Sequence, residues 1–192
     1  MPKQSKSQEV RIIGGKWKGR KLRFKSNPDL RPTLGRTRET LFNWLRPNIE
    51  GSLCLDLFAG SGILGIEALS QGAKHVTFVD RSRQATAGIT QALYEVNATA
   101  DVNTVLCGEA QRFLDQQNNR FDIVFIDPPF AKPELLTSVL TKLPKHLSED
   151  GYCYIEAPAR FDLDASLENT QLQRIKQTRA GDTQSFLCTS QS

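Results

Sequence analysis

Short apolar runs alternate with amphipathic segments over most of this 192-residue chain. Five apolar runs are bounded by glycine, proline or polar residues, which is typical of buried strands: 53–57, 75–79, 102–107, 121–127 and 152–157. Helical spacing fills the segments between them, at 63–72, 82–97, 109–117 and 133–147. Strands that alternate with helices predict a mainly parallel sheet of the doubly wound type.

Both ends of the chain depart from this alternation. Residues 11–25 mix basic residues with β-forming residues and glycines, which predicts a short hairpin, and helical spacing begins again after Gly35. Near the other end, strand-like runs at 171–179 and 184–188 flank a Gly-Asp turn and predict an antiparallel hairpin. We expect residues 1–10 and the last few residues to be frayed.

A glycine-rich turn follows the first apolar run. Gly60, Gly62 and Gly65 fit the G-x-G-x-x-G fingerprint, and Asp80 ends the next strand, where a ribose-binding acid belongs. A dinucleotide and S-adenosylmethionine (SAM) both suit such a turn. Asp56, just before the turn, would repel a pyrophosphate and attract the ammonium of SAM, which favours SAM. A glycine turn without a ligand is the third interpretation.

The tetrapeptide Asp127-Pro128-Pro129-Phe130 closes another apolar run. It sets one carboxylate, several backbone carbonyls and one flat ring around a small space, which suits a planar molecule with an amino group. A simple proline turn after a buried strand is the alternative. Together with the glycine turn, the tetrapeptide predicts an enzyme that acts on a nucleobase amine.

Four acidic residues follow strands of the predicted sheet: Asp56, Asp80, Glu109 and Asp127. Ligands of doubly wound sheets bind at the carboxyl ends of the strands, so these residues should meet at one rim. We expect Asp80 to accept from ribose hydroxyls and the turn at 108–110 to lie beside adenine. Glu109 either binds the adenine amino group or begins the following helix, where an acid complements the helix dipole.

Positive charge is concentrated at the N-terminus. Residues 1–38 carry twelve Lys or Arg and two acidic residues, a net +10, whereas the other 154 carry thirteen and nineteen, a net −6. Basic residues interleaved with Trp17 and Phe24 predict a nucleic-acid contact, and a solvated basic arm is the alternative. Three further arginines are placed to touch phosphates or the carboxylate of the cofactor, or to form surface ion pairs: Arg31, Arg36 and Arg38.

The remaining composition limits the other possibilities. No apolar run is long enough to span a membrane. Four scattered cysteines without a C-x-x-C motif predict small buried side chains in a reducing compartment, not a zinc or disulfide site: Cys54, Cys107, Cys153 and Cys188. We expect no chemistry from His75 or His146.

These segments resemble the RsmD family of bacterial SAM-dependent methyltransferases, which modify guanine N2 in small-subunit ribosomal RNA. The resemblance covers nearly the whole chain and rests on 11–20, 31–33, 38–45, 58–62 and 127–130. The arginine-rich N-terminal pattern is the family-specific part. The resemblance implies an α/β fold with a Rossmann-like seven-stranded methyltransferase sheet. It divides the chain into a basic hairpin and helix extension at 1–48, which packs on the core, and a methyltransferase domain at 49–192.

The resemblance also implies a role for each candidate residue. The residues that hold the target amine are Asp127, Pro128, Pro129 and Phe130. Those that bind SAM are Asp56, Phe58, Gly60, Ser61, Gly62, Asp80, Arg81, Glu109 and Ala110, although related enzymes often carry Asn or Asp in place of Glu109. Those that bind RNA are Arg11, Lys16, Trp17, Lys18, Arg20, Lys21, Arg31, Arg36 and Arg38. No metal is implied, and the partner is 16S ribosomal RNA within an assembling small subunit.

Three other interpretations remain open. The tetrapeptide also serves methylation of adenine N6, the glycine turn also serves NAD-dependent oxidoreductases, and a methyltransferase scaffold can act as a non-catalytic RNA-binding assembly factor. Asp56 argues against the oxidoreductase, and the intact tetrapeptide argues against the assembly factor. We expect a cytoplasmic monomer without membrane association.

Overall fold

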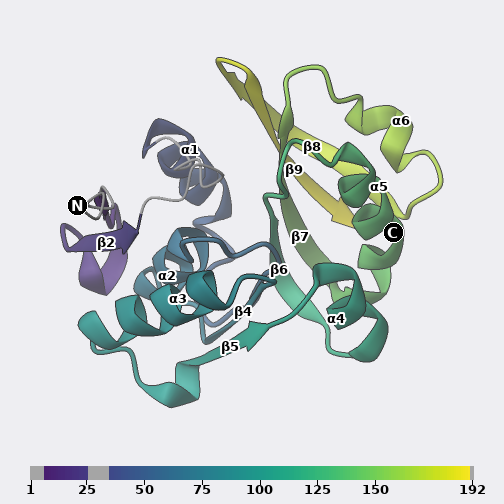
Figure 1. Cartoon of the computed structure of the whole chain (residues 1–192). Coiled ribbons are helices and arrows are strands. Elements are labelled where there is room, and N and C mark those ends of the chain that lie inside the picture. The colour runs from purple at the N-terminus through teal and green to yellow at the C-terminus, as the bar shows by residue number, and fades with distance from the viewer. Residues whose placement is uncertain (1–6, 26–34, 191–192) are drawn as a thin grey trace, which may run out of the picture.

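A seven-stranded sheet forms the centre of the computed structural model, which describes residues 7–25 and 35–190 (Figure 1). The predicted RNA contact Arg31 lies outside the described residues. The strand order is β5-β4-β3-β6-β7-β9-β8. The strands are β3 (Leu53–Asp56), β4 (His75–Asp80), β5 (Asn103–Cys107), β6 (Phe121–Ile126), β7 (Leu147–Pro158), β8 (Leu172–Ala180) and β9 (Thr183–Ser190). Neighbours from β5 to β7 are parallel, and β9 is antiparallel to both β7 and β8.

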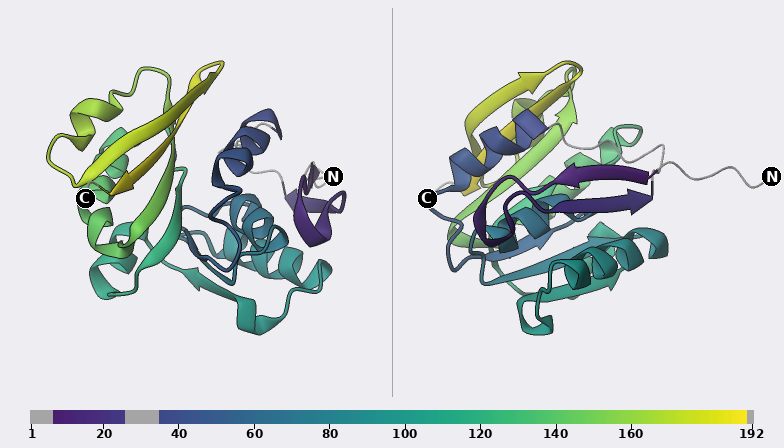
Figure 2. Two further views of the ribbon diagram at one scale, coloured as in Figure 1. Left: turned by 180° about the vertical axis from the view of Figure 1, so that it is seen from behind. Right: turned by 90° about the vertical axis from the view of Figure 1, so that its left-hand side faces the viewer.

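Helices cover both faces of this sheet, as Figures 1 and 2 show. One face carries α1 (Gly35–Leu45), α2 (Ile63–Ser70) and α3 (Arg83–Glu95). The other carries α4 (Ala110–Gln116), α5 (Pro133–Lys142) and α6 (Leu163–Leu167). Short 3-10 turns occupy Gly15–Trp17, Ala100–Val102 and Leu143–His146. The predicted α/β class and both predicted hairpins are confirmed, the N-terminal one as β1 (Ser7–Arg11) and β2 (Lys21–Lys25).

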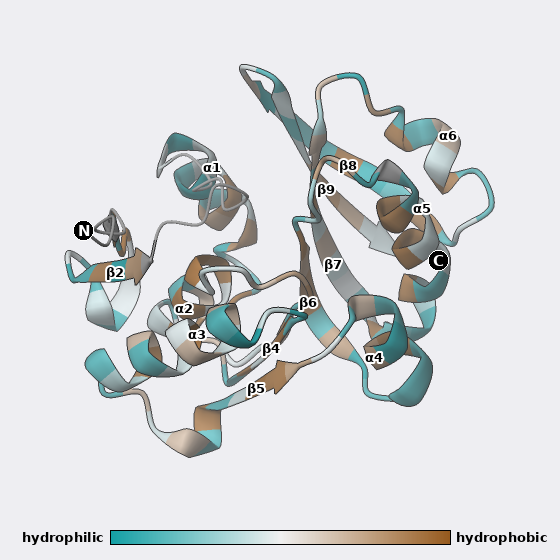
Figure 3. Cartoon of the chain, in the orientation of Figure 1, coloured by the Kyte–Doolittle hydropathy of each residue, from teal (hydrophilic) through white to brown (hydrophobic). Residues whose placement is uncertain are grey.

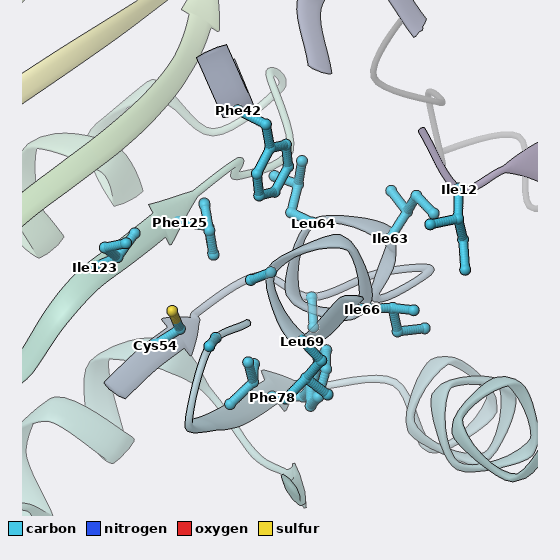
Figure 4. Close-up of a cluster of buried hydrophobic side chains, with 14 of the residues drawn as sticks. Ile12, Phe42, Cys54, Ile63, Leu64, Ile66, Leu69, Phe78, Ile123 and Phe125 are labelled. Atoms are coloured by element: carbon cyan, nitrogen blue, oxygen red, sulfur yellow. The ribbon is translucent and has the colours of Figure 1, made fainter. Parts of the chain in front are cut away.

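The hydrophobic core forms one cluster on each face of the sheet. Figure 4 shows the first, which joins the sheet to α1 and α2 and in which the rings of Phe42 and Phe125 lie 6.1 Å apart. The second lies under α4, α5 and α6 and contains Val124 and Ile126 of β6. Successive β6 side chains alternate between the clusters because a strand points them to opposite faces. Figure 3 shows hydrophobic colour on the edge strand β5, where Leu106 is 38% exposed.

The N-terminal hairpin is docked on α2 by a buried carboxylate. Glu67 is fully buried and accepts hydrogen bonds from the backbone N–H groups of Ile13, at 3.0 Å, and Gly14, at 2.7 Å. Ser70 accepts from the Trp17 N–H at 3.0 Å and donates to the Gly14 carbonyl at 2.6 Å. The division of the chain at residue 48 stays a prediction, since the first hydrophobic cluster runs continuously across it.

Several boundaries differ from the predicted ones. The helix predicted over 133–147 ends at Lys142 and tightens into a 3-10 turn, because Pro144 has no N–H to continue the α-helical hydrogen bonds. Residues 7–10, which we expected to fray, pair with 22–25. The strand predicted at 152–157 begins earlier, at Leu147, and the five-residue α6 is too short to show a helical period.

Two further observations concern the described residues. Within 7–25 and 35–190, no helix combines the length and apolar character needed to cross a bilayer. Cys54, Cys153 and Cys188 are buried and free, as predicted, whereas Cys107 at the end of the edge strand is exposed.

Candidate active site

The predicted rim exists because four parallel strands end together. Asp56 ends β3, Asp80 ends β4, Glu109 lies two residues after the end of β5, and Asp127 directly follows β6. Backbone hydrogen bonds continue past the strands: the Leu57 N–H donates to the Phe125 carbonyl at 3.1 Å and the Ala59 N–H to the Val79 carbonyl at 3.0 Å. The turn after β3 is therefore held between β4 and β6.

The glycine turn has the backbone shape that only glycine adopts readily. Gly60 and Gly62 have φ values of 53° and 73°, in the left-handed region. Gly65 serves a different purpose, since a Cβ there would lie 2.2 Å from the ring of Phe78 on β4. The three glycines thus allow the tight turn and the close packing of α2 on the sheet.

Asp80 ties this turn to the next strand. Its Oδ2 accepts from the Gly60 N–H at 2.8 Å, and its Oδ1 accepts from the Ser82 N–H at 2.8 Å. The Ser82 hydroxyl in turn accepts from the Ala85 N–H and caps α3. Asp80 therefore stands at the end of β4 with a fixed orientation, in the position expected for a ribose-binding acid.

Asp56 lies beneath the turn and is only 3% exposed. Its Oδ2 accepts from the Gly65 N–H at 3.1 Å. Burial raises the pKa of Asp56 to about 7, the Gly65 N–H opposes this rise, and the charge of Asp80 adds to it. Once Asp56 is ionised, the two carboxylates create a negative field at the turn, which favours a cationic ligand such as SAM and disfavours a pyrophosphate.

The other predicted cofactor residues lie in the glycine turn, directly after β4, or at the start of α4. Phe58 and Ser61 are half-buried, and Arg81 is exposed directly after Asp80. Glu109 occupies the N-cap position of α4, but its side chain makes no cap hydrogen bond, and Ala110 behind it is buried. Glu109 is exposed at the N-terminus of α4, so both roles predicted for it, binding the adenine amino group and complementing the helix dipole, stay predictions.

The tetrapeptide forms the other half of the rim. Asp127 and Phe130 are half-buried, Pro128 is buried and Pro129 is exposed. The Lys132 N–H donates to the Pro129 carbonyl at 3.0 Å, which closes a turn before α5. Glu156 lies on the neighbouring strand β7 near its carboxyl end. The sequence analysis did not name Glu156, although the rule that ligands bind at the carboxyl ends of parallel strands applies to it as it does to Asp127.

The basic N-terminal residues are placed in two different ways. Six are exposed on the hairpin or at the start of α1: Arg11, Lys16, Lys18, Arg20, Lys21 and Arg36. Some already have partners, since Lys21 pairs with Glu9 at 2.7 Å and Arg20 donates to the Val96 carbonyl at the end of α3 at 3.1 Å. Lys16 lies 4.5 Å from the centre of the Trp17 ring.

Trp17 and Arg38 require a correction, because the structure buries both. Trp17 is 7% exposed within the first hydrophobic cluster, so its ring packs in the protein and is not open for stacking on a base. Arg38 is 3% exposed; it donates to the Arg11 carbonyl at 3.1 Å and pairs with Glu67 at 3.5 Å. Its guanidinium fastens the hairpin to α1 and α2 and does not face RNA.

A hollow of about 380 Å³ lies elsewhere, at the amino-terminal ends of the strands. Leu53, His75 and Phe121, the first residues of their strands, line it. None of the predicted site residues contributes to it. In the described part of the chain, no cluster of three or more His, Cys, Asp or Glu side chains is arranged to hold a metal ion.

Known proteins match this chain along most of its length. The family model described as Conserved hypothetical protein 95 matches residues 10–189. Ribosomal RNA small subunit methyltransferase D of Escherichia coli K12 is 41% identical over 179 residues, which are 91% of this chain and 88% of that protein. The Haemophilus influenzae protein of the same name is 48% identical over 124 residues, 64% of each chain.

Solved structures agree with the sequence matches. The Escherichia coli protein yhhF is 36% identical and superposes with a TM-score of 0.83, covering 96% of this chain and 99% of that one. The region matched by the family model includes most of the N-terminal hairpin, the glycine turn and the tetrapeptide. The chain therefore belongs to the RsmD family of methyltransferases, which the matching model describes as Conserved hypothetical protein 95.

Proposed function

We propose that this chain transfers a methyl group from SAM to the exocyclic N2 amine of a guanine in small-subunit ribosomal RNA. One observation carries the proposal: β3 pairs with β6, so the glycine turn after Asp56 and the tetrapeptide at Asp127 start from adjacent strand ends. A methyl donor in the turn and an amine at the tetrapeptide would be neighbours. The names of the curated relatives support the RNA substrate.

The residues at the turn fit SAM. Asp80 would accept from the ribose hydroxyls, and the negative field of Asp56 and Asp80 would attract the ammonium. The glycines let the ligand approach the backbone closely, because no Cβ stands in the way. Phe58, Ser61, Arg81, Glu109 and Ala110 complete the proposed cofactor side.

The chemistry follows from the nature of a purine amine. SAM, when bound, supplies a methyl group on a sulfonium that a nucleophile can attack in line. The exocyclic amine is a poor nucleophile because its lone pair is conjugated with the ring. The Asp127 carboxylate and the Pro128 carbonyl would accept its two N–H bonds, favour a more pyramidal nitrogen and direct its lone pair.

The protein's main contribution is therefore position. SAM would supply the methyl group and leave as S-adenosylhomocysteine, and the proton that the amine loses would pass to Asp127 or to solvent. An aspartate is a weak base at its ordinary pKa. The main role of Asp127 would therefore be to orient the amine and to stabilise the positive charge that develops on its nitrogen. Holding nitrogen and methyl about 3–3.5 Å apart supplies most of the acceleration. Phe130 would stack on the base, worth about 1–3 kcal/mol, and the guanine must leave its helix to enter.

The exposed basic residues would hold the RNA backbone. Arg11, Lys16, Lys18, Lys21 and Arg36 lie on the hairpin and at the start of α1. Each phosphate they neutralise adds salt-dependent affinity. We propose that the substrate is the RNA within an assembling small subunit and that the enzyme acts as a cytoplasmic monomer.

The test is methyl transfer from labelled SAM to small ribosomal subunits that lack native methylation, followed by nucleoside digestion. N2-methylguanosine is the expected product. If the product were N6-methyladenosine, the enzyme would still methylate a base amine, but its substrate would be adenine and the proposal for guanine would be wrong. Tight SAM binding without transfer to subunits or free RNA would overturn the proposal.

A further inference from the structure

Glu156 lies beside Asp127 in the sheet. β6 and β7 are parallel, with Phe125 opposite Tyr154 and Ile126 opposite Ile155. The next residues along the two strands are Asp127 and Glu156, so their backbones are neighbours at the carboxyl end of the sheet.

Both carboxylates also point to the same face. Phe125 and Tyr154 belong to the first hydrophobic cluster, whereas Ile126 and Ile155 belong to the second. Because strand side chains alternate, Asp127 and Glu156 follow Phe125 and Tyr154 onto the face that α1 and α2 cover. This is also the face on which the cofactor turn leads into α2.

Glu156 is held in place by a buried tyrosine. It is 5% exposed and accepts from the hydroxyl of the fully buried Tyr154 at 2.7 Å. Burial and then the charge of Glu156 raise the pKa of the Tyr154 hydroxyl well above its ordinary value, with a further contribution from Asp127, so the hydroxyl remains a donor.

The stability of the fold does not account for placing Asp127 and Glu156 side by side at the ends of β6 and β7. A buried carboxylate is costly, and a second carboxylate beside it adds repulsion. Apolar residues of similar volume often stabilise a core as well as buried charges do. Buried charges kept close together at a strand end are instead typical of functional sites.

We propose that Glu156 determines base specificity by accepting the N1–H of guanine, while Asp127 holds the neighbouring N2 amine. The proposal rests on the proposed function and names the residue that would recognise the base to be methylated. Guanine presents N1–H and N2–H donors next to each other. Adenine has an acceptor at N1, which would face the Glu156 carboxylate without a proton between them, and such a mismatch is strongly rejected.

The test compares two bases at the modified position, once the methylated nucleotide is mapped. Subunits are rebuilt with ligated RNA that carries guanine or 2-aminopurine there; the analogue keeps the N2 amine but has an acceptor at N1. The wild-type protein should prefer guanine by about 10- to 100-fold in kcat/KM, the range for hydrogen bonds to a charged group. In Glu156→Gln, the amide can donate to the analogue, so the preference should fall to within about threefold.

The change in preference separates this role from a structural one. Loss of the O6 atom in 2-aminopurine affects both proteins equally, so the ratio isolates the N1 contact. SAM affinity should be unchanged, and Glu149→Gln on the exposed part of β7 is the matched control. An unchanged guanine preference in Glu156→Gln overturns the proposal, even where overall activity falls.

A second variant covers the case in which Glu156→Gln does not fold. Tyr154→Phe keeps the ring and removes the hydroxyl that orients Glu156, so the preference should drop several-fold, and an unchanged preference overturns the proposal. If the wild-type protein methylates no guanine at all, the proposed function itself fails. If the wild-type protein methylates guanine and the analogue equally well, the proposed methyl transfer is supported, but Glu156 does not recognise the base and the present proposal is wrong.

Discussion

The buried pair of Glu67 and Arg38 gives a quantitative test of how the N-terminal hairpin is attached. Glu67→Gln keeps the shape of the side chain and removes its charge. Arg38 would then keep a guanidinium that is 3% exposed without a charged partner. Breaking a buried ion pair by removing one partner costs about 3–5 kcal/mol.

Other contacts of Glu67 point to the upper part of this range. The carboxylate also accepts from the N–H groups of Ile13 and Gly14 and from the Gln71 amide. A glutamine in its place has one acceptor oxygen and turns an NH2 group toward these donors. For a chain whose whole stability is about 5–15 kcal/mol, the loss would be a large fraction.

The assay is urea denaturation of wild type and variant, followed by circular dichroism and by tryptophan fluorescence. The chain also contains Trp44 in α1, so the fluorescence is measured in a Trp44→Phe background. The emission of Trp17 in the docked hairpin should then shift to the exposed value at lower urea than the far-ultraviolet signal if the hairpin detaches first. Arg38→Met in the Glu67→Gln background should recover stability, because it removes the unpaired charge.

Glu9→Gln is the matched control, since Glu9 pairs with Lys21 on the surface of the same hairpin. Exposed ion pairs contribute little, so this variant should unfold like the wild type. If Glu67→Gln also unfolds like the wild type, water reaches the pair and our account of the docking is wrong.

Three further predictions concern the rim. Asp127→Ala should abolish methyl transfer while SAM affinity and RNA affinity stay nearly unchanged; parallel loss of SAM binding would place Asp127 on the cofactor side. Because burial raises the pKa of Asp56 to about 7, the folded protein binds a proton there that the unfolded chain releases near pH 4. Stability should therefore fall as pH rises from about 4 to about 7, SAM affinity should increase through pH 7, and calorimetry should find both dependences flattened in Asp56→Asn. Gly65→Ala, whose Cβ would meet Phe78 at 2.2 Å, should cost about 1–3 kcal/mol by overpacking and weaken SAM binding. Thermal melts measure the loss of stability in Gly65→Ala. In the control Gly88→Ala, the added Cβ meets open space in α3, so the melting temperature should stay the same or rise.

The glycine turn and its acids were predictable because their signals are local. Gly60, Gly62 and Asp80 have a fixed spacing, and the carboxyl ends of parallel strands meet by geometry. The same reasoning placed Asp127 at the rim. The hairpin of β8 and β9 also followed from turn residues and apolar runs, whereas the order of the strands in the sheet was not predicted.

Burial of charged residues was not predictable in the same way. Arg38 and Glu67 lie 29 residues apart, and nothing local distinguishes this arginine from the exposed Arg36. A basic, tryptophan-containing segment is typical of RNA contact, but the hairpin needs an apolar side facing α2, and Trp17 supplies it. Charge counting therefore identified the right segment and assigned two of its residues to the wrong surface.

The attachment of the hairpin also links the two proposed binding surfaces. Gly62, at the end of the glycine turn, is the N-cap of α2, and Glu67 lies five residues further along, within the helix. One rigid helix thus sets the position of the turn at one end and of the basic hairpin along its side. A shift of α2 would move both together, because the hairpin is bound to it through Glu67 and Ser70. This shared support would let the proposed RNA-binding arm at the N-terminus place a base at the tetrapeptide, although Asp127 lies more than a hundred positions later in the chain.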